Sequence, residues 1–174
     1  VALYLEFADK EMGAEVYSVA TTREQARICF KYAQDMVRFS DLKKYALVTR
    51  DAIVYEPLGC AYKPLSSDAR NLDGCHSHGV IVDEYHAHRT DEVYDVMQTS
   101  LGARQQPLML IITTAGLNTS VPCFAYRKTM TQILDGAVDA ERNFAIIYTL
   151  DDLEEVDNPA MWIKANPCYG ISLS

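Results

Sequence analysis

The sequence predicts an α/β domain with a mostly parallel β-sheet flanked by helices. Three continuous apolar runs lack the alternation of a half-exposed strand, at residues 79–82, 108–112 and 144–148. Runs of this kind predict strands that are buried on both faces, and segments with helical spacing separate them, which is the order of a parallel sheet with crossover helices. Polar side chains directly follow the first two runs, and ligands of such sheets bind at the carboxyl ends of the strands.

The first forty residues predict the end of a helix, a strand and a second helix. Residues 1–7 have the apolar character of a helix tail, and a β-prone run follows at 15–20. Thr21 and Glu24 have the spacing of a capping box, in which each side chain bonds a backbone amide of the other residue. Apolar residues then recur at the spacing of one helix face, which predicts an amphipathic helix into the late thirties. They are Ala26, Phe30, Ala33 and Val37.

The middle of the chain predicts short strands, a polar segment and two further helices. Residues 45–65 are strand-like but contain two prolines and a glycine, which predicts short strands or a hairpin. Residues 66–78 are polar and rich in turn-forming types. Helical spacing then predicts helices at 91–101 and 123–134, one before and one after the second apolar run.

Composition and charge fit one folded domain. The chain has 174 residues, of which 49% are hydrophobic, so it can bury a sizeable core. Its net charge of −8 argues against a bulk electrostatic interaction with nucleic acid, so binding DNA would require a local basic patch or a partner. Pairs such as Lys43-Lys44 and Arg127-Lys128 are too sparse to form such a basic patch.

The five cysteines are odd in number and widely spaced, which predicts reduced thiols in a cytoplasmic setting. No run approaches the ~20 apolar residues of a membrane span, so we expect no membrane association.

Two adjacent carboxylates, Asp83 and Glu84, end the first apolar run. This is the Walker B arrangement, in which one carboxylate holds Mg²⁺ and the next orients and deprotonates the water that attacks a nucleotide. Adjacent strand residues point to opposite faces, so both can serve one site only where the strand bends at its end. The motif by itself is weak, because many strands end in surface acids.

The second apolar run ends in Thr113-Thr114-Ala115-Gly116. Hydroxyls and exposed amides at the end of a buried strand can sense a γ-phosphate, although a strand followed by a glycine turn has the same appearance. The two strand ends taken together are more informative than either one alone. One helix separates a strand that ends in two carboxylates from a strand that ends in two threonines, which is the order in translocating P-loop ATPases.

Five groups of residues, in order along nearly the whole chain, resemble the large-subunit terminases of tailed phages and prophages. They are Tyr17-Ser18-Val19-Ala20-Thr21 with Gln25-Ala26; Leu65-Ser66-Ser67-Asp68; Asp83-Glu84-Tyr85-His86; Gln106-Pro107-Leu108-Met109 with Ile112-Thr113-Thr114-Ala115-Gly116; and Trp162 with Ala165-Asn166-Pro167. The resemblance implies a P-loop NTPase core of the ASCE or RecA-like type that uses ATP and Mg²⁺. It also implies that Asp83 binds the metal, that Glu84 is the catalytic base, and that Thr113 and Thr114 couple hydrolysis to movement.

The sequence departs from the family at its nucleotide loop. Family members carry a Walker A loop, G-x-x-x-x-G-K-[ST], which should lie just before the first helix of this chain, yet no glycine here is followed by lysine. We therefore expect residues 1–155 to be an ATPase domain that is incomplete at its N-terminus. Residues 156–174 are then a linker toward a missing nuclease domain, with Trp162 anchoring it on the ATPase body. Alone, the fragment is expected to be inactive.

The resemblance also implies partners for the parent protein. Such a motor packages double-stranded DNA into a procapsid with the small terminase subunit and the portal protein, and its nuclease cuts DNA. The resemblance implies a homo-oligomeric ring only in the assembled motor, located in the cytoplasm of the host bacterium and absent from the mature virion. Arg70, just before the first apolar run, is the candidate for an arginine that reaches a neighbouring subunit's nucleotide.

Two alternatives remain open from the sequence. His-x-His pairs flank the first apolar run, at His76 and His78 and at His86 and His88. Such pairs can chelate zinc or iron, so the chain could be a metal-dependent hydrolase with Asp83 or Glu84 as a further ligand. The second alternative is a docking or assembly module without enzymatic activity.

Overall fold

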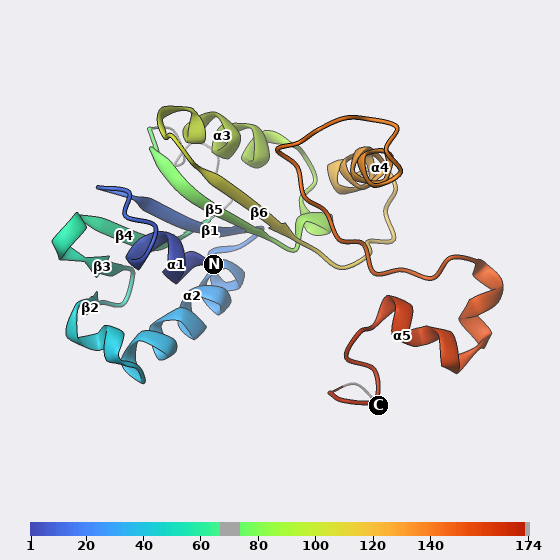
Figure 1. Ribbon diagram of the computed structural model, residues 1–174, viewed down its shortest axis with the longest axis horizontal. Coiled ribbons are helices and arrows are strands. Elements are labelled where there is room, and N and C mark those ends of the chain that lie inside the picture. The colour runs from blue at the N-terminus through green and yellow to red at the C-terminus, as the bar shows by residue number, and fades with distance from the viewer. Residues whose placement is uncertain (67–73, 173–174) are drawn as a thin grey trace. The chain divides into compact units, whose positions relative to one another are not determined.

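The computed structural model describes residues 1–66 and 74–172, and its centre is a six-stranded sheet in the order β2-β3-β4-β1-β5-β6 (Figure 1). The strands from β4 to β6 in this order pair in parallel, whereas β2, β3 and β4 pair antiparallel. The prediction of a mostly parallel sheet is therefore confirmed. The strands are β1 (Glu15–Ala20), β2 (Leu47–Val48), β3 (Ile53–Tyr55), β4 (Cys60–Ser66), β5 (Ser77–Asp83) and β6 (Leu108–Ile112).

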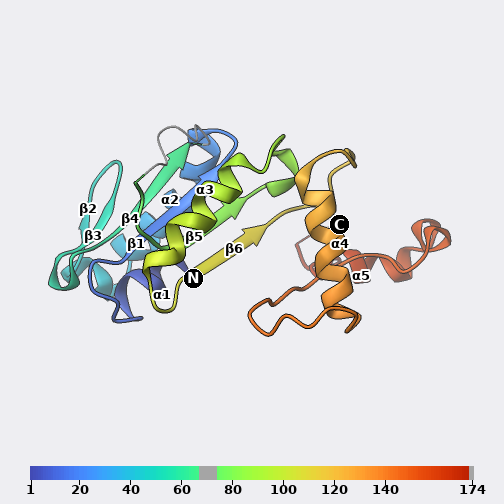
Figure 2. The same ribbon diagram turned by 90° about the horizontal axis from the view of Figure 1, so that it is seen from above.

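Helices lie on both faces of this sheet. Figures 1 and 2 show α1 and α2 on one face and α3 on the other. This arrangement explains why β1 and β5 are buried along almost their whole length, since both faces of each strand are covered. The α-helices are α1 (Ala2–Phe7), α2 (Arg23–Arg38), α3 (Glu92–Ser100), α4 (Pro122–Leu134) and α5 (Trp162–Ala165).

The core has two parts because side chains alternate across the strands. On the α1 and α2 side, Val16 and Ile81 pack in one cluster with Phe30 of α2. On the α3 side, Val80 and Val82 pack in a second cluster with Met97 of α3. Val16, Val82 and Met97 are fully buried. The two clusters hold β5 between two helix layers and thereby fix the position of its C-terminal end.

The helix α2 begins one residue later than the predicted capping box requires. Its N-cap is Thr22, whose hydroxyl accepts a hydrogen bond from the Gln25 amide at 3.2 Å. The hydroxyl of Thr21 instead bonds the side-chain oxygen of Gln25. The prediction of Thr21 as the cap is wrong because two consecutive threonines precede the helix, and spacing alone does not say which of them adopts the extended cap conformation.

The third predicted strand, at residues 144–148, does not form. No regular element covers these residues, and Phe144, Ile146 and Tyr148 are exposed. A strand exists only where its backbone amides and carbonyls pair with a neighbouring strand, and the described residues offer none to this segment. The second predicted strand forms as β6 but is only partly buried, because it is the edge strand and pairs with β5 alone.

The chain has two compact units, Val1–Arg127 and Lys128–Ser174. In the second unit the Trp162 indole donates to the Val156 carbonyl at 2.8 Å, and its ring packs edge-on against Tyr169 at 5.5 Å. The Lys164 ammonium bonds Asp151 at 2.7 Å. These contacts give the C-terminal residues their own local structure. The anchoring of Trp162 on the ATPase body and the domain boundary after residue 155 both remain predictions.

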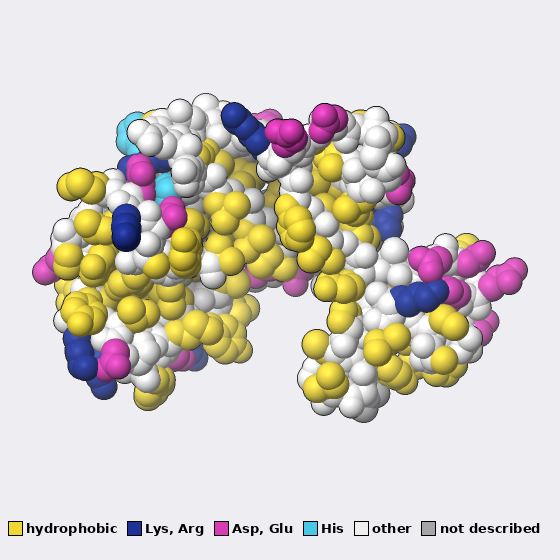
Figure 3. Space-filling view, viewed as in Figure 1, with side chains coloured by type: hydrophobic (Ala, Val, Ile, Leu, Met, Phe, Trp, Pro, Cys, Tyr) yellow, Lys and Arg dark blue, Asp and Glu magenta, His cyan; other side chains and the backbone are white. Residues whose placement is uncertain are grey.

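Two surface properties bear on partners. In the part of the chain that the structure describes, every helix is too short or too polar to cross a bilayer. Figure 3 shows Lys and Arg side chains in small separate groups on the face in view, interspersed with acidic and apolar ones. This face therefore has no extended basic surface of the kind that grips the phosphates of DNA.

Candidate functional site

The ends of β5 and β6 lie side by side at the carboxyl edge of the sheet. Asp83 is the last residue of β5 and pairs in register with Ile112, the last residue of β6. Thr113 therefore follows directly beside the Asp83-Glu84 pair. The predicted adjacency of the two strand ends is confirmed, whereas the chemical roles of these residues remain predictions.

Glu84 has a backbone conformation that is rare for a residue with a side chain. Its φ of 51° and ψ of 49° lie in the left-handed region, and its amide donates to Asp83 Oδ1 at 3.0 Å. Strained residues of this kind persist only where the surroundings hold them, and they cluster at functional sites. The turn ends the alternation of β5 immediately after Asp83, which is the bend that two adjacent carboxylates need to serve one site.

The short 3₁₀ helix η4 (Tyr85–Ala87) connects this turn to β6 through His86. The His86 backbone amide donates to Thr113 Oγ1 at 3.0 Å. Its ring Nδ1 lies 3.1 Å from Thr113 Oγ1, 3.4 Å from Thr114 Oγ1 and 3.1 Å from Glu84 Oε2. His86 thus brings three predicted site residues together. The sequence placed His86 in a His-x-His pair and in the Asp83-Glu84-Tyr85-His86 group but predicted no role for it in this site, although its place two residues after Glu84 was the available signal.

Asp83 also faces α2. The Cys29 thiol of that helix donates to Asp83 Oδ2 at 3.4 Å. Burial, reinforced by the hydrogen bond to Asp83 and by its negative charge, raises the pKa of Cys29 to about 11. Cys29 is therefore a neutral thiol at physiological pH, and it adds no negative charge beside the carboxylate.

An aromatic cluster packs around Tyr85, the residue that follows Glu84 in this turn. Tyr85 is buried, and its hydroxyl donates to Asp91 Oδ1 at 2.9 Å. Its ring packs against Tyr94 of α3 and Tyr126 of α4, with centroids 5.9 Å away in each case. Burial raises the pKa of Tyr85, so its hydroxyl keeps its proton. The residue that follows Glu84 is thus fixed to two helices, which restricts the movement of Glu84 itself.

The histidines do not form the metal site of the first alternative. His78 is buried and its Nε2 lies 2.6 Å from Asp9 Oδ2, away from the other pair. Burial lowers the pKa of His88, which packs beside Tyr85. The described residues contain no group of three or more His, Cys, Asp or Glu side chains that could hold a metal ion. This finding counts against the metal-dependent hydrolase.

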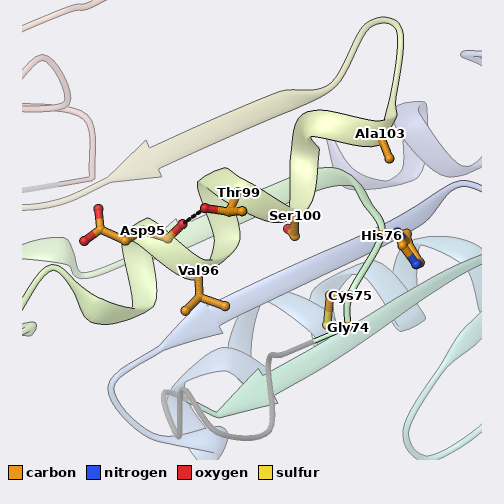
Figure 4. Close-up of a pocket in the computed structure, with 8 residues that line it drawn as sticks. All are labelled: Gly74, Cys75, His76, Asp95, Val96, Thr99, Ser100 and Ala103. Carbon is orange, nitrogen blue, oxygen red and sulfur yellow. Dashed lines mark hydrogen bonds between the residues drawn. The ribbon is translucent and has the colours of Figure 1, made fainter.

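A shallow hollow of about 440 Å³ lies near the opposite end of β5. Residues 74–76, which precede β5, form one side, and α3 with the turn after it forms the other (Figure 4). Figure 4 shows the His76 ring and the Asp95 carboxylate well separated, so they form no common site. Arg70, the candidate for the trans-acting arginine, lies outside the described residues, and the structure does not place it.

Comparisons with known proteins identify the family of the chain. A family model described as the ATPase domain of the terminase large subunit matches residues 1–132. Protein YmfN of Escherichia coli (strain K12) is 45% identical over 104 residues, which cover 60% of this chain and 23% of that protein. The large terminase subunit of Enterobacteria phage HK97 is 26% identical over 163 residues, covering 90% of this chain and 31% of its own length. The chain therefore spans less than a third of either relative.

Solved structures show the same fold. The crystal structure of the HK97 bacteriophage large terminase aligns with a TM-score of 0.82 and 23% identity, covering 98% of this chain and 36% of that one. The large terminase ATPase domain of Thermus phage P74-26 aligns with a TM-score of 0.54 and 24% identity, covering 67% and 53%. The predicted P-loop type of α/β fold is confirmed by these neighbours. Because the family model matches most of its length, the chain belongs to the terminase large-subunit family, and residues 1–132 correspond to the ATPase domain.

Proposed function

We propose that the chain is part of an ATPase that drives double-stranded DNA into a phage procapsid. The observation that carries this proposal is the adjacency of Asp83-Glu84 and Thr113 at the ends of two paired parallel strands. The carboxylates that would bind the metal and the water lie beside hydroxyls that can respond to the γ-phosphate. A structural change on hydrolysis at the end of β5 can therefore pass to the end of β6.

The residues present fit a magnesium nucleotide. Mg²⁺ prefers carboxylate oxygens and usually keeps several waters, and Asp83 offers an oxygen whose only described side-chain partner is a weak thiol donor. Glu84 Oε2 is buried and has no hydrogen-bond partner among the described residues, so it is available to accept a proton. Magnesium would supply neutralisation of the phosphate charge. Asp83 would hold it, and Glu84 would orient and deprotonate the attacking water.

The proposed coupling role of Thr113 and Thr114 follows from their position. Both are exposed, and both lie within 3.4 Å of the His86 ring, which also faces Glu84. A displacement of these threonines would therefore reach the turn that carries the catalytic base. Arg70 remains the proposed trans-acting arginine, because a guanidinium is always charged and pairs with phosphate oxygens in a fork.

Further parts of the proposal concern the whole protein. We propose double-stranded DNA, the small terminase subunit and the portal protein as partners, a homo-oligomeric ring in the assembled motor, and a location in the host cytoplasm. Residues 156–174 would lead toward a nuclease domain that cuts DNA. The net charge of −8 means that contact with DNA would require a local surface or a partner rather than bulk attraction.

The test is magnesium-dependent ATP hydrolysis by a polypeptide that joins these residues to a Walker A segment of the family. We expect hydrolysis in that polypeptide and none in the 174-residue chain, which contains no Gly-Lys pair to cradle a triphosphate. Glu84→Gln should lower kcat by roughly 10²–10⁴-fold, the usual contribution of a general base, and should leave ATP binding intact. Glu92→Gln, a change in the first turn of α3, is the matched control. If the joined polypeptide stays inactive with DNA and packaging partners present, the docking module becomes the better interpretation.

A further inference from the structure

We propose that His86 is a positioning residue, with its proton on Nδ1, which links the Glu84 carboxylate to Thr113 on the neighbouring strand. The inference rests on the proposed function, in which Glu84 is the base and Thr113 belongs to the coupling segment. It adds a residue to that site and a physical connection between its two halves.

The oxygens around the ring determine which nitrogen carries the proton. Nδ1 lies 3.1 Å from Glu84 Oε2 and 3.1 Å from Thr113 Oγ1. A carboxylate only accepts hydrogen bonds, and this oxygen is buried with no hydrogen-bond partner in the part of the chain that the structure describes. The Thr113 hydroxyl can donate to the Thr114 carbonyl at 3.0 Å, and it accepts from the His86 amide. An unprotonated Nδ1 would direct its lone pair at the carboxylate, whereas a protonated Nδ1 satisfies the acceptors around it.

The Nδ1 proton then faces two acceptors at 3.1 Å, Glu84 Oε2 and Thr113 Oγ1, while the Thr114 hydroxyl lies farther away at 3.4 Å. When Nδ1–H points to Thr113, Glu84 Oε2 stays unpaired at 3.1 Å, as the described geometry has it. When it points to Glu84, the imidazole stabilises the ionised carboxylate and fixes its orientation. Thr113 also holds the His86 backbone through the 3.0 Å amide bond. A displacement of Thr113 therefore moves the donor that faces Glu84, which gives the coupling strand a direct path to the base.

The surrounding packing keeps His86 in place. Gly116, three residues after Thr113, lies so close that a Cβ at that position would be 3.0 Å from the His86 Cβ. On the other side, Tyr85 is held by Asp91 and by the aromatic rings of α3 and α4. The His86 side chain is 28% exposed, so it is neither a core residue nor a fully solvated one. Its backbone is fixed while the ring can turn between its two acceptors.

The first experiment reads the tautomer without nucleotide. Nitrogen NMR of the ¹⁵N-histidine-labelled protein, with the His86 signals assigned by their loss in His86→Asn, should show Nδ1 protonated and Nε2 unprotonated in the neutral ring. Thr113→Val should shift the Nδ1 resonance, and Thr119→Val, a change in the same exposed loop, should not. A neutral ring with its proton on Nε2 would overturn the inference.

The second experiment uses two variants that separate the nitrogens. In the Walker A-containing polypeptide, Asn at position 86 puts an amide donor near the place of Nδ1, whereas Gln reaches toward Nε2. We expect His86→Asn to retain most of kcat and His86→Gln to lose roughly tenfold or more with KM for ATP unchanged, since misplaced catalytic groups cost rates of this order. Equal losses in the two variants would contradict the inference. Absence of hydrolysis by the unsubstituted polypeptide would count against the proposed function instead, and the tautomer measurement alone would then decide the role of His86.

Discussion

Gly79 of β5 approaches Leu5 of α1 so closely that a Cβ at position 79 would lie 2.5 Å from the Leu5 Cδ1. It would also lie 3.2 Å from Val16 Cγ1 of the adjacent strand. Leu5 is only 5% exposed and Val16 is fully buried, so neither side chain has open space beside it. The absence of a side chain at Gly79 allows α1 to pack directly on the strand that ends in Asp83.

Gly79→Ala should therefore reduce the free energy of unfolding. Forcing an extra methyl into a well-packed core costs typically about 1–3 kcal/mol. Urea unfolding at neutral pH measures the effect. Gly102→Ala is the matched control because a Cβ there meets nothing within 4 Å, and it should change stability by less than about 0.5 kcal/mol. Adding Leu5→Ala to Gly79→Ala should produce a smaller total loss than the sum of the two single changes; simple additivity would mean that the two residues do not clash.

Glu6 predicts a pH dependence of stability. The residue is 1% exposed, and burial raises the pKa of its carboxyl to about 8, because it outweighs the opposite effect of a hydrogen bond with the Tyr62 backbone. The unfolded chain releases this proton near the ordinary value of 4.5, so folding at higher pH requires proton uptake. The contribution of Glu6 to the free energy of unfolding should therefore be most favourable below pH 4.5 and should decrease as the pH rises toward 8. For one proton the decrease is at most about 1.4 kcal/mol per pH unit.

Glu6→Gln removes this dependence, because an amide does not titrate. The stability difference between Glu6→Gln and the unsubstituted protein should grow in favour of the variant from pH 5 to pH 8 and then level off. Urea midpoints at half-unit pH intervals measure it. Glu141→Gln, at an exposed position, should run parallel to the unsubstituted protein throughout. A constant difference across this range would show that Glu6 keeps the same protonation state in the folded and unfolded chains.

The sequence predicted the sheet well where both faces of a strand are covered. The apolar run at 79–82 forms the centre of β5, since its residues alternate between two helix layers. The run at 144–148 has the same character and forms no strand, because hydrophobicity does not reveal whether a pairing edge exists. The exposure of β6 has the same origin, since position in the strand order is a long-range property.

The candidate site was predictable in part for similar reasons. Asp83, Glu84, Thr113 and Thr114 end consecutive parallel strands, and topology requires such ends to meet at one edge. The contact of His86 with Thr113 was not predicted, because it joins residues 27 positions apart through a turn in the left-handed region. Spacing along the chain carries no information about that turn.

The cap of α2 gives a second stability prediction. Thr22→Ala removes the hydroxyl that accepts from the Gln25 amide and should lower the free energy of unfolding by about 1 kcal/mol. Thr21→Ala leaves this bond in place and should cost less. Thermal or urea unfolding of both variants measures the difference. A larger loss of stability in Thr21→Ala than in Thr22→Ala would instead support Thr21 as the N-cap, as the capping-box spacing predicted.

Arg104 connects the chain before β6 to the start of the fold. Its guanidinium donates to the carbonyls of Gly13 at 2.6 Å, Met12 at 3.1 Å and His76 at 3.2 Å, and it pairs with Glu11 at 3.2 Å. The side chain is 16% exposed, and its bond to Gly13 is partly buried, whereas its bonds to Met12 and His76 are exposed to water. Arg104→Met leaves the partly buried Gly13 carbonyl without this donor and should cost about 1–3 kcal/mol of unfolding free energy, the usual penalty for one unsatisfied buried acceptor.

Comparing Arg104→Lys with Glu11→Gln distinguishes the role of the planar guanidinium group from that of the ion pair with Glu11. Lysine keeps the charge but lacks the planar fork that reaches several carbonyls at once, so Arg104→Lys should retain less than half of the stabilisation. Glu11→Gln removes only a partly exposed ion pair and should cost less than about 1 kcal/mol. Urea unfolding measures both changes. Because Arg104 lies four residues before β6, Arg104→Met should also accelerate amide hydrogen exchange at Leu110 and Ile111 of that strand. If exchange at these two amides is unchanged, pairing with β5 is sufficient to hold β6 in place.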